Sequence, residues 1–578
     1  MKNLKPLLPY LLGHKLALLA GFAVTIVSTL LALAQPYLIG SAIDSLQRGR
    51  PAGVVYTLAL EILGLAAVQG IFTFQLRYFF NKVSRQIEYE MRRDFFAHLE
   101  RMPQSFFGEM HTGDIMARAT NDMSAVRSFL GPGILNTTNT SLMFVLAAVP
   151  MFGIDAGLAV IALVFLPVVS IAFTIVGRRM NQHYEKVQAQ FGVLSTHAQE
   201  NFSGIRVIKA YGQEDLQISD FAVSNREYVR RSMAYQRLSG LLWPTMGLVL
   251  GLTTATILFV GGSDVIDGRI SLGQFVQFNG YLGMLSWPMI ALGWVVNLYQ
   301  QGAASLTRIM EVMSHDPEIR DHAETRPIST IRGSVTFRDV HLSYDGRKVL
   351  DGLSFDLPAG KTLAILGATG VGKTSIVNLI SRVHEAQSGQ VLVDGVDVRN
   401  IPLAVLRRSL GMVPQDTYLF SVALRENVAF GVDMVDEGKL AQAVTVARLS
   451  NDIDQFPGGL DTVIGERGVT LSGGQKQRTA IARAVMRDPA ILILDDALSS
   501  IDTATQAEIL GGLKHVLANR TSIIIAHRVS TVKAADSIIV LEDGRVAEQG
   551  RHTELLALNG RYAAMYRREL LSQEMEVE

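Results

Sequence analysis

Long runs of apolar residues recur through the N-terminal part of the chain. No Asp, Glu, Lys or Arg lies between Leu16 and Ile43. A helix of that length, rising about 1.5 Å per residue, exceeds a hydrocarbon core of about 30 Å. Comparable runs predict six membrane spans, at about 16–43, 51–76, 129–154, 156–177, 238–263 and 270–300. We therefore expect residues 1–325 to form an all-α bundle of six transmembrane helices.

The loops between these spans differ in charge. The long connections, residues 77–127 and 178–237, are rich in Lys and Arg, whereas the short ones contain Asp44, Asp155 and Asp264. Basic loops stay on the cytoplasmic side of a membrane. An even number of spans then places both termini in the cytoplasm. Because the long loops are patterned as amphipathic helices, we expect the spanning helices to continue as cytoplasmic extensions.

After about residue 325 the pattern changes to short β-branched runs that alternate with helical ones, as in an α/β domain. Several runs are apolar throughout, which is typical of strands buried on both faces of a parallel sheet. We expect a cytoplasmic α/β domain over residues 326–578. Its predicted strands are 335–344, 361–367, 390–395, 490–496, 521–527 and 537–544.

Composition narrows the function classes. Apolar residues make up 48% of the chain and charged residues only 18%, below the roughly 25% usual for soluble proteins, which favours a lipid membrane as partner. Basic and acidic residues balance at 53 each, so no net field indicates a nucleic-acid partner. The absence of cysteine excludes disulfides, thiolate nucleophiles and Cys-ligated metals.

A Gly-rich sequence follows the strand that ends at residue 367. Gly-Ala-Thr-Gly-Val-Gly-Lys-Thr occupies 367–374 and leads into an apolar helix, the context of a phosphate-binding P-loop. Its backbone N–H groups and the helix N-terminus can bind the phosphates of ATP. Lys373 is expected on the β and γ phosphates, and the Thr374 hydroxyl on Mg²⁺. The other ATP contacts expected here are Gly367, Thr369, Gly370, Gly372 and Ser375.

Two more motifs, the apolar run before Asp495 and the sequence at 471–475, also indicate a nucleotide-binding domain. Four apolar residues precede Asp495, which is placed to hold Mg²⁺ through water. Leu-Ser-Gly-Gly-Gln at 471–475 matches the signature of ABC transporters, and the whole chain resembles an ABC exporter half-transporter of the multidrug type. In that family the signature motif caps ATP bound by the opposite subunit. The resemblance therefore implies a dimer, with ATP contacts from Ser472, Gly473, Gly474 and Gln475.

The resemblance also assigns roles to single residues. Tyr344 is similar to the aromatic residue that stacks on adenine. Gln415 matches the Q-loop glutamine near Mg²⁺ and the attacking water, and Asp502 the D-loop aspartate at the dimer interface. His527 matches the switch histidine that senses the γ-phosphate. Glu466 lies in a loop that resembles the exporter-specific contact to the partner's cytoplasmic helices.

One position departs from the family pattern. Asp495 resembles the Walker B aspartate of the family. The residue that follows it is normally a glutamate that polarises the attacking water, but here it is Asp496. Its side chain is one methylene shorter, and a displacement of about 1 Å can cost about a hundredfold in rate. We expect a weakly hydrolytic site and a heterodimer with a second half-transporter chain that keeps the glutamate. A homodimer that uses Asp496 as a slow base is the alternative.

The cargo does not follow from the sequence. Amphipathic drugs, lipids and peptides all suit an apolar cavity between helices, and the resemblance implies their export across the cytoplasmic (inner) membrane. The same arrangement of a membrane domain and an ATP-binding domain also suits an ATP-gated channel or a regulatory membrane protein, which is the alternative function. Glu61 lies within a predicted span, where a charge either faces the cavity or packs near an interface.

Overall fold

The computed structural model describes residues 2–344, 346–465, 471–518 and 520–577. It divides into two compact units. The first comprises Met1–Glu100 and His111–His315, and the second Arg101–Met110 and Asp316–Glu578. The division after His315 follows the end of the last long helix at Met313, whereas the sequence boundary was expected near residue 325.

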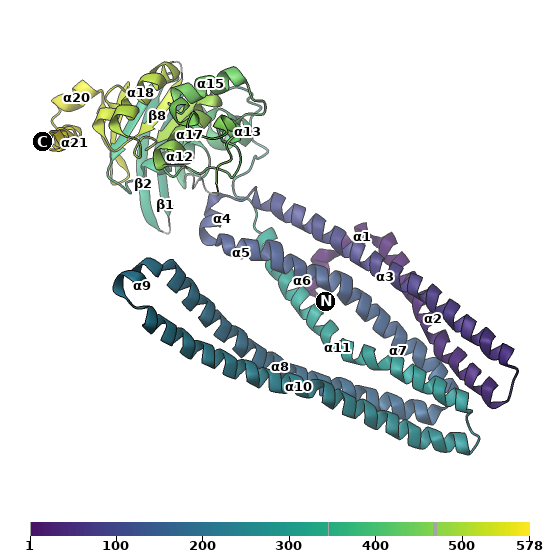
Figure 1. Ribbon diagram of the computed structural model, residues 1–578. Helices are drawn as coiled ribbons and strands as arrows, with labels where there is room; N and C mark the ends of the chain where they lie inside the picture. Colours follow the sequence, from purple (N-terminus) through teal and green to yellow (C-terminus); the bar gives the residue numbers. More distant parts are fainter. Residues whose placement is uncertain (1, 345, 466–470, 519, 578) are drawn as a thin grey trace. The chain divides into compact units, whose positions relative to one another are not determined.

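The first unit is entirely helical among the described residues. Helices α8 and α10 run side by side as a long hairpin that α9 closes at its tip (Figure 1). The elements are η1 (Lys2–Leu7), α1 (Leu8–Gly13), α2 (Lys15–Gln47), α3 (Ala52–Leu99), α5 (Thr112–Ala117), η2 (Arg118–Asp122), α6 (Met123–Ser128), η3 (Phe129–Gly133), α7 (Ile134–Ile154), α8 (Ala156–Ser203), α9 (Ile205–Tyr211), α10 (Glu214–Ile266) and α11 (Leu272–Met313).

Four helical stretches within the described residues are long and apolar enough to cross a membrane: Lys15–Gln47, Ala52–Leu99, Thr112–Ile154 and Glu214–Ile266. The six expected spans fall within α2, α3, η3–α7, α8, α10 and α11, and their number remains a prediction. Helix α3 has 48 residues, about 72 Å at 1.5 Å per residue. The helices therefore continue well beyond the length that a hydrocarbon core requires.

Polar contacts hold the C-terminal end of α11 to the helices of the first long loop. The Arg308 guanidinium pairs with both carboxylate oxygens of Asp122, with its Nε 2.9 Å from Oδ2. Asp122 is 7% exposed and also accepts the Ser305 hydroxyl at 2.8 Å. His98 Nε2 lies 3.1 Å from the carbonyl oxygen of Val312. A buried carboxylate needs such partners, so this end of α11 moves together with α3 and η2.

The second unit contains two sheets. A six-stranded sheet has the order β10-β9-β3-β8-β7-β6, parallel except for β10, and a four-stranded antiparallel sheet has the order β2-β1-β4-β5. The strands are β1 (Val335–Tyr344), β2 (Arg347–Leu357), β3 (Thr362–Gly367), β4 (Ser388–Val393), β5 (Val396–Asp397), β6 (Leu410–Val413), β7 (Ile491–Asp495), β8 (Thr521–Ile525), β9 (Ser537–Glu542) and β10 (Arg545–Gly550).

The second unit also contains helices, most of which lie between the strands along the chain. They are α4 (Gln104–Glu109), α12 (Lys373–Ile380), η4 (Val398–Asn400), α13 (Leu403–Arg408), α14 (Leu424–Val428), η5 (Ala429–Gly431), α15 (Glu437–Val446), α16 (Ser450–Ile453), η6 (Gly459–Asp461), α17 (Gly473–Met486), α18 (Thr503–Leu517), α19 (Val529–Val532), α20 (His552–Ala557) and α21 (Arg561–Val577).

The central sheet is buried on both faces. Along β3, Ala364 and Leu366 pack into one apolar cluster with α17 and α18, while Leu363 and Ile365 pack into the other with the antiparallel sheet. Successive side chains of a strand point to opposite faces, which explains the unbroken apolar runs in the sequence. All six predicted strands are confirmed, and β2, β5, β6 and β10 were not expected.

Candidate nucleotide site

The loop between β3 and α12 has a backbone that only certain residues can adopt. Gly372, which precedes α12, has φ +103°. A Cβ at this position would lie 2.9 Å from the carbonyl oxygen of Val349, closer than side-chain carbons approach oxygen. Glycine is therefore required here by both conformation and space. The following helix begins at Lys373 and directs its first N–H groups toward the loop.

The residues predicted to bind ATP come together around one hollow of about 260 Å³. They arrive from the P-loop, from the end of β1, from the segment that follows β6, and from the ends of β7 and β8, which lie far apart in the sequence. The carboxyl ends of parallel strands meet at one edge of a sheet, where ligands bind in this architecture. The predicted residues that line the hollow are Tyr344, Thr369, Gly370, Gly372, Lys373, Thr374, Ser375, Gln415, Asp495, Asp496 and His527.

Lys373 is held inside the loop. Its Nζ donates to the carbonyl oxygens of Gly367 and Ala368, both at 2.8 Å, and the residue is only 6% exposed. Burial lowers the pKa of Lys373, and the negative charges of Asp495 and Asp496 oppose that shift. The ammonium group thus stays close to its carbonyl partners, where the oxygens of a phosphate can replace them.

Asp495, at the end of β7, is the most deeply buried carboxylate of the site. It is 2% exposed, and its Oδ2 is buried with no hydrogen-bond partner among the described residues. Burial raises the pKa of Asp495, and Asp496 adds to the shift, while a hydrogen bond with Thr374 opposes it. An orphaned carboxylate oxygen beside a hydroxyl fits a hard divalent cation with oxygen ligands such as Mg²⁺. No cluster of three or more His, Cys, Asp or Glu occurs in the described part of the chain.

Asp496 occupies a strained backbone position. Its φ is +48°, in the left-handed region where Asp is one of the commoner non-glycine residues. Its backbone N–H donates to the carbonyl oxygen of Ile525 at 3.0 Å, which fixes the turn after β7 against the end of β8. The residue lines the nucleotide hollow and also a neighbouring cavity of about 230 Å³ that reaches His527 and Ser499.

Tyr344, Gln415 and His527 form the rim of the hollow. The Tyr344 ring makes an edge contact with the His384 ring, with 5.3 Å between centroids, and it remains 37% exposed. Gln415 and His527 are also exposed. An exposed aromatic face and two exposed polar groups leave this rim accessible to a base and a triphosphate.

The signature residues lie outside this hollow, since none of Ser472–Gln475 lines it. Ser472 caps α17: its hydroxyl accepts the Gln475 N–H at 3.3 Å, and the Gln475 side chain accepts the Ser472 N–H at 2.9 Å. The amide of Gln475 also donates to Asp452 at 3.1 Å. This capping box fixes the signature residues at the start of α17, outside the hollow that the P-loop lines.

The remaining predicted residues behave differently. Asp502 caps α18 by accepting the Thr505 N–H at 2.9 Å, and this backbone hydrogen bond lowers the pKa of Asp502. Glu466 lies outside the described residues. Sequence reasoning missed Val349 and Ile525, which contribute apolar surface to the hollow. Recognising β2 as a strand was the signal that could have identified Val349.

Comparison with known proteins agrees with this geometry. Residues 18–289 match the family described as "ABC transporter transmembrane region", and residues 350–499 match "ABC transporter". The chain is 35% identical over 567 residues to "Probable multidrug resistance ABC transporter ATP-binding/permease protein YheI" of Bacillus subtilis, which covers 97% of this chain and 96% of the relative. It is 32% identical over 563 residues to an "ATP-dependent lipid A-core flippase" of Desulfotalea psychrophila, at 97% and 98% coverage.

A solved structure is similar along almost its whole length. "Structure of a bacterial Atm1-family ABC exporter with ATP bound" superposes with a TM-score of 0.80 at 29% identity, and covers 96% of this chain and 98% of that one. The likeness therefore includes both units of the chain.

Proposed function

Because this chain belongs to the ABC transporter family, as an exporter with its membrane region fused to an ATP-binding domain, we propose that it is the weakly hydrolytic half of a heterodimer. ATP-driven translocation is the activity of the family. The finer proposal concerns how this chain divides the work with its partner. One observation supports it: Asp496, which follows Asp495 in the sequence, lines the same hollow as Lys373 and Thr374.

The chain's own hollow binds ATP. Lys373 exchanges its two carbonyl partners for the β and γ phosphates, and the N–H groups of the loop and of α12 add hydrogen bonds. Tyr344 stacks on the adenine, since its ring is exposed at the rim. Thr374 and Asp495, with Gln415, would hold Mg²⁺, which supplies charge neutralisation of the phosphates when bound.

The signature helix serves the partner's nucleotide. Ser472, Gly473 and Gly474 are at the start of a 14-residue helix, whose N-terminus favours an anion. The capping box and the contact of Gln475 with Asp452 preorganise this surface. ATP bound between a P-loop on one chain and a signature motif on the other joins the two chains, and Asp502 takes part at the same interface.

Hydrolysis at this chain's own site is slow. Asp496 carries the charge of a glutamate but reaches less far, and its backbone is fixed to β8 through Ile525. The water that it polarises therefore lies farther from the γ-phosphate, or is poorly oriented, and positioning dominates phosphoryl transfer. His527, which contacts the γ-phosphate, remains in place. The site holds ATP tightly, while the partner's site turns it over.

Transport follows from closure of the two ATP-binding domains. ATP favours the closed pair, and rigid-body motion of the helical extensions opens the cavity to the opposite side. Hydrolysis at the partner's site resets the pair. The relatives named for multidrug resistance and for lipid A-core flipping support amphipathic drugs, lipids or peptides as cargo. The chain lies in the cytoplasmic membrane with six spans, and both termini and the ATP-binding domain face the cytoplasm.

The test is purification from the native membrane through an affinity tag on this chain. We expect a second half-transporter to copurify, and the pair to hydrolyse ATP about a hundredfold faster than this chain alone, the factor that a displacement of about 1 Å costs. Rapid hydrolysis by the chain alone, with no second protein present, would contradict the heterodimer and support the homodimer.

A further inference from the structure

The segment that connects α11 to β1 is bonded to the ATP-binding unit rather than free of it. We call residues 320–326 the linker strap. At its C-terminal end the Arg326 N–H donates to the carbonyl oxygen of Asn400 at 2.8 Å. At its N-terminal end, the carbonyl oxygen of Arg320 accepts a hydrogen bond from the same unit. Only residues 314–319 lie between α11 and the strap.

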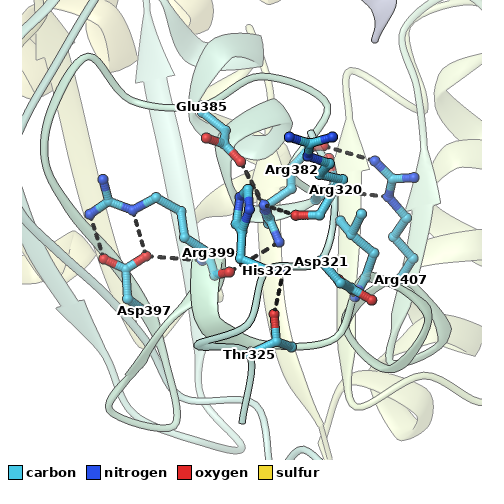
Figure 2. Close-up of polar contacts among 11 residues, drawn as sticks. Arg320, Asp321, His322, Thr325, Arg382, Glu385, Asp397, Arg399 and Arg407 are labelled. Carbon is cyan, nitrogen blue, oxygen red and sulfur yellow. Dashed lines mark hydrogen bonds and ion pairs between the residues drawn. The ribbon is translucent and has the colours of Figure 1, made fainter. Parts of the chain in front are cut away.

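Arg382 holds the N-terminal end of the strap. Its side chain is completely buried, and its Nη2 donates to the carbonyl oxygen of Arg320 at 3.4 Å and to Glu385 at 2.7 Å (Figure 2). Its Nη1 donates to the carbonyl oxygen of Arg399 at 3.4 Å. A buried guanidinium must have its donors satisfied. One of those acceptors is the strap backbone, so the strap is part of what keeps Arg382 in place.

Asp321 joins the strap to α13. Its Oδ1 accepts the N–H of Leu403 at 2.9 Å. Leu403 is the first residue of α13, and the N-cap of this helix is Pro402, which makes no side-chain cap hydrogen bond. Asp321 therefore provides the acceptor and the negative charge that the start of α13 lacks. It is exposed, so its main contact is this one.

Arg407 completes the connection. It lies on α13, and its Nε and Nη2 donate to the carbonyl oxygens of Ser381 at 3.3 Å and Arg382 at 2.8 Å. These two carbonyls follow directly after the P-loop helix α12. The strap, α13 and the end of α12 thus form one hydrogen-bonded triangle, and Figure 2 shows Arg382 and Arg407, which form part of it.

Two corners of the triangle lead to predicted ATP contacts. Helix α12 begins at Lys373, and α13 leads through β6 to Gln415. The other end of the connection is equally fixed, because Arg308 and Val312 of α11 are bonded to Asp122 and His98. A displacement of α11 can therefore reach both walls of the nucleotide hollow through a short covalent segment.

We propose that the linker strap is a coupling element, in which Asp321 and Arg382 are positioning residues that pass motion between the P-loop and Q-loop segments and the last membrane helix. This inference rests on the ATP-driven export cycle proposed above. It adds a path within one chain to the path through the cytoplasmic loops. The direction of transmission is reciprocal, as coupling free energies require.

The chain supplies its own reporter for the test. All three of its tryptophans, Trp243, Trp287 and Trp294, precede the ATP-binding domain, so their emission reports on the membrane unit alone. The transporter is purified through a tag on this chain, together with any partner that it retains, and the partner's tryptophans are replaced by Phe so that only this chain emits. A non-hydrolysable ATP analogue with Mg²⁺ is added, the emission change is recorded, and binding is measured separately with trinitrophenyl-ATP.

Three variants are compared. For Asp321→Ala and Arg382→Lys we expect nucleotide affinity within about twofold of the unmodified chain and an emission change reduced about tenfold, the scale of a typical coupling free energy. Arg399→Lys is the matched control, because its side chain donates to Asp397 and Gly389 and not to the strap. It should retain the full change.

The outcomes separate the two proposals. An undiminished emission change in nucleotide-bound Asp321→Ala overturns the strap, and since Asp321 is exposed this variant tests it even if Arg382→Lys does not fold. If nucleotide affinity falls by the same factor as the emission change, the proposal is also overturned, because the substituted residues then only maintain the structure of the nucleotide site. An unmodified transporter that binds nucleotide without any emission change contradicts the export cycle itself, and the strap with it.

Discussion

The side chain of Gln477 accepts the backbone N–H of Ser500 at 3.0 Å. Gln477 lies on the signature helix α17 and is 4% exposed, while Ser500 lies in the turn that follows Asp496. The amide nitrogen of Gln477 also donates to the Ser499 hydroxyl at 3.1 Å. One side chain therefore fixes the signature helix against the segment that leads to Asp502, so the signature motif and this segment keep a fixed relative position.

Gln477→Leu should loosen this junction. The substitution leaves the Ser500 N–H without its partner, and we expect a loss of about 1–3 kcal/mol in stability, measured by thermal unfolding of the detergent-solubilised chain. ATP hydrolysis by the complete transporter should fall more than ATP binding does. Gln477→Glu is the control, because it keeps the acceptor for Ser500. Equal melting temperatures for the Leu variant and the unmodified chain would show that the contact contributes nothing.

Asp496→Glu should increase hydrolysis at this chain's site. The longer side chain restores the reach of the usual glutamate, and we expect turnover to rise by about ten- to a hundredfold. The rate is measured with the partner's catalytic glutamate replaced by Gln, so that only this site contributes. Asp496→Asn should remain slow. If Glu and Asn give the same rate, the position of this carboxylate does not limit hydrolysis.

Asp495→Asn should stabilise the nucleotide-free chain at neutral pH. Burial raises the pKa of Asp495 above its usual 3.8, so the folded state binds a proton more readily than the unfolded state between 3.8 and the raised pKa. The ionised carboxylate destabilises the fold above this window, and that cost disappears as the pH falls through it. The melting-temperature advantage of the Asn variant should therefore shrink at acidic pH.

Mg²⁺ together with ATP should make the unmodified chain more stable than the Asp495→Asn variant. With ATP and Mg²⁺ present, the unmodified chain gains the binding free energy of the complex, which the Asn variant largely loses because the cation's carboxylate ligand is gone. Removing Mg²⁺ with a chelator should restore the advantage of Asn. A variant whose melting temperature rises with Mg-ATP as much as that of the unmodified chain would exclude Asp495 from the cation site.

Gly372→Ala should abolish ATP binding. Its φ of +103° strains any side chain, and a Cβ would lie 2.9 Å from Val349 O. We expect nucleotide affinity to fall by more than about tenfold, since strain and clash together cost about 1–3 kcal/mol or more. Gly360→Ala is the matched control, because Gly360 also has a positive φ, +76°, but open space around it. It should lose some stability and retain ATP binding.

Features that depend on a few consecutive residues could be predicted from the sequence. The P-loop, the signature and the apolar strand before Asp495 each depend on a few consecutive residues, whose spacing sets their conformation. The spans of apolar residues and the six buried strands are equally local, since burial on both faces of β7 requires an unbroken apolar run. The partly exposed strand β2 was missed, because its apolar positions alternate with Asp, Gly and Ser.

Contacts between segments that are distant in the sequence could be identified only from the tertiary structure. That Gln415 and His527 share one hollow follows from the strand order, since the carboxyl ends of parallel strands meet at one edge. Tyr344 reaches the same hollow from the end of β1, which belongs to the antiparallel sheet. The resemblance gave them their roles but not their distances.

By itself, then, the sequence predicted which residues bind phosphate and determined which segments are apolar enough for lipid, because both depend on neighbours along the chain. Only the tertiary structure decided that Asp321 caps α13, that buried Arg382 holds the strap, and that Asp495 has an oxygen without a partner among the residues that the structure describes. Those properties depend on which backbone groups folding brings within hydrogen-bonding distance, and no local pattern encodes them.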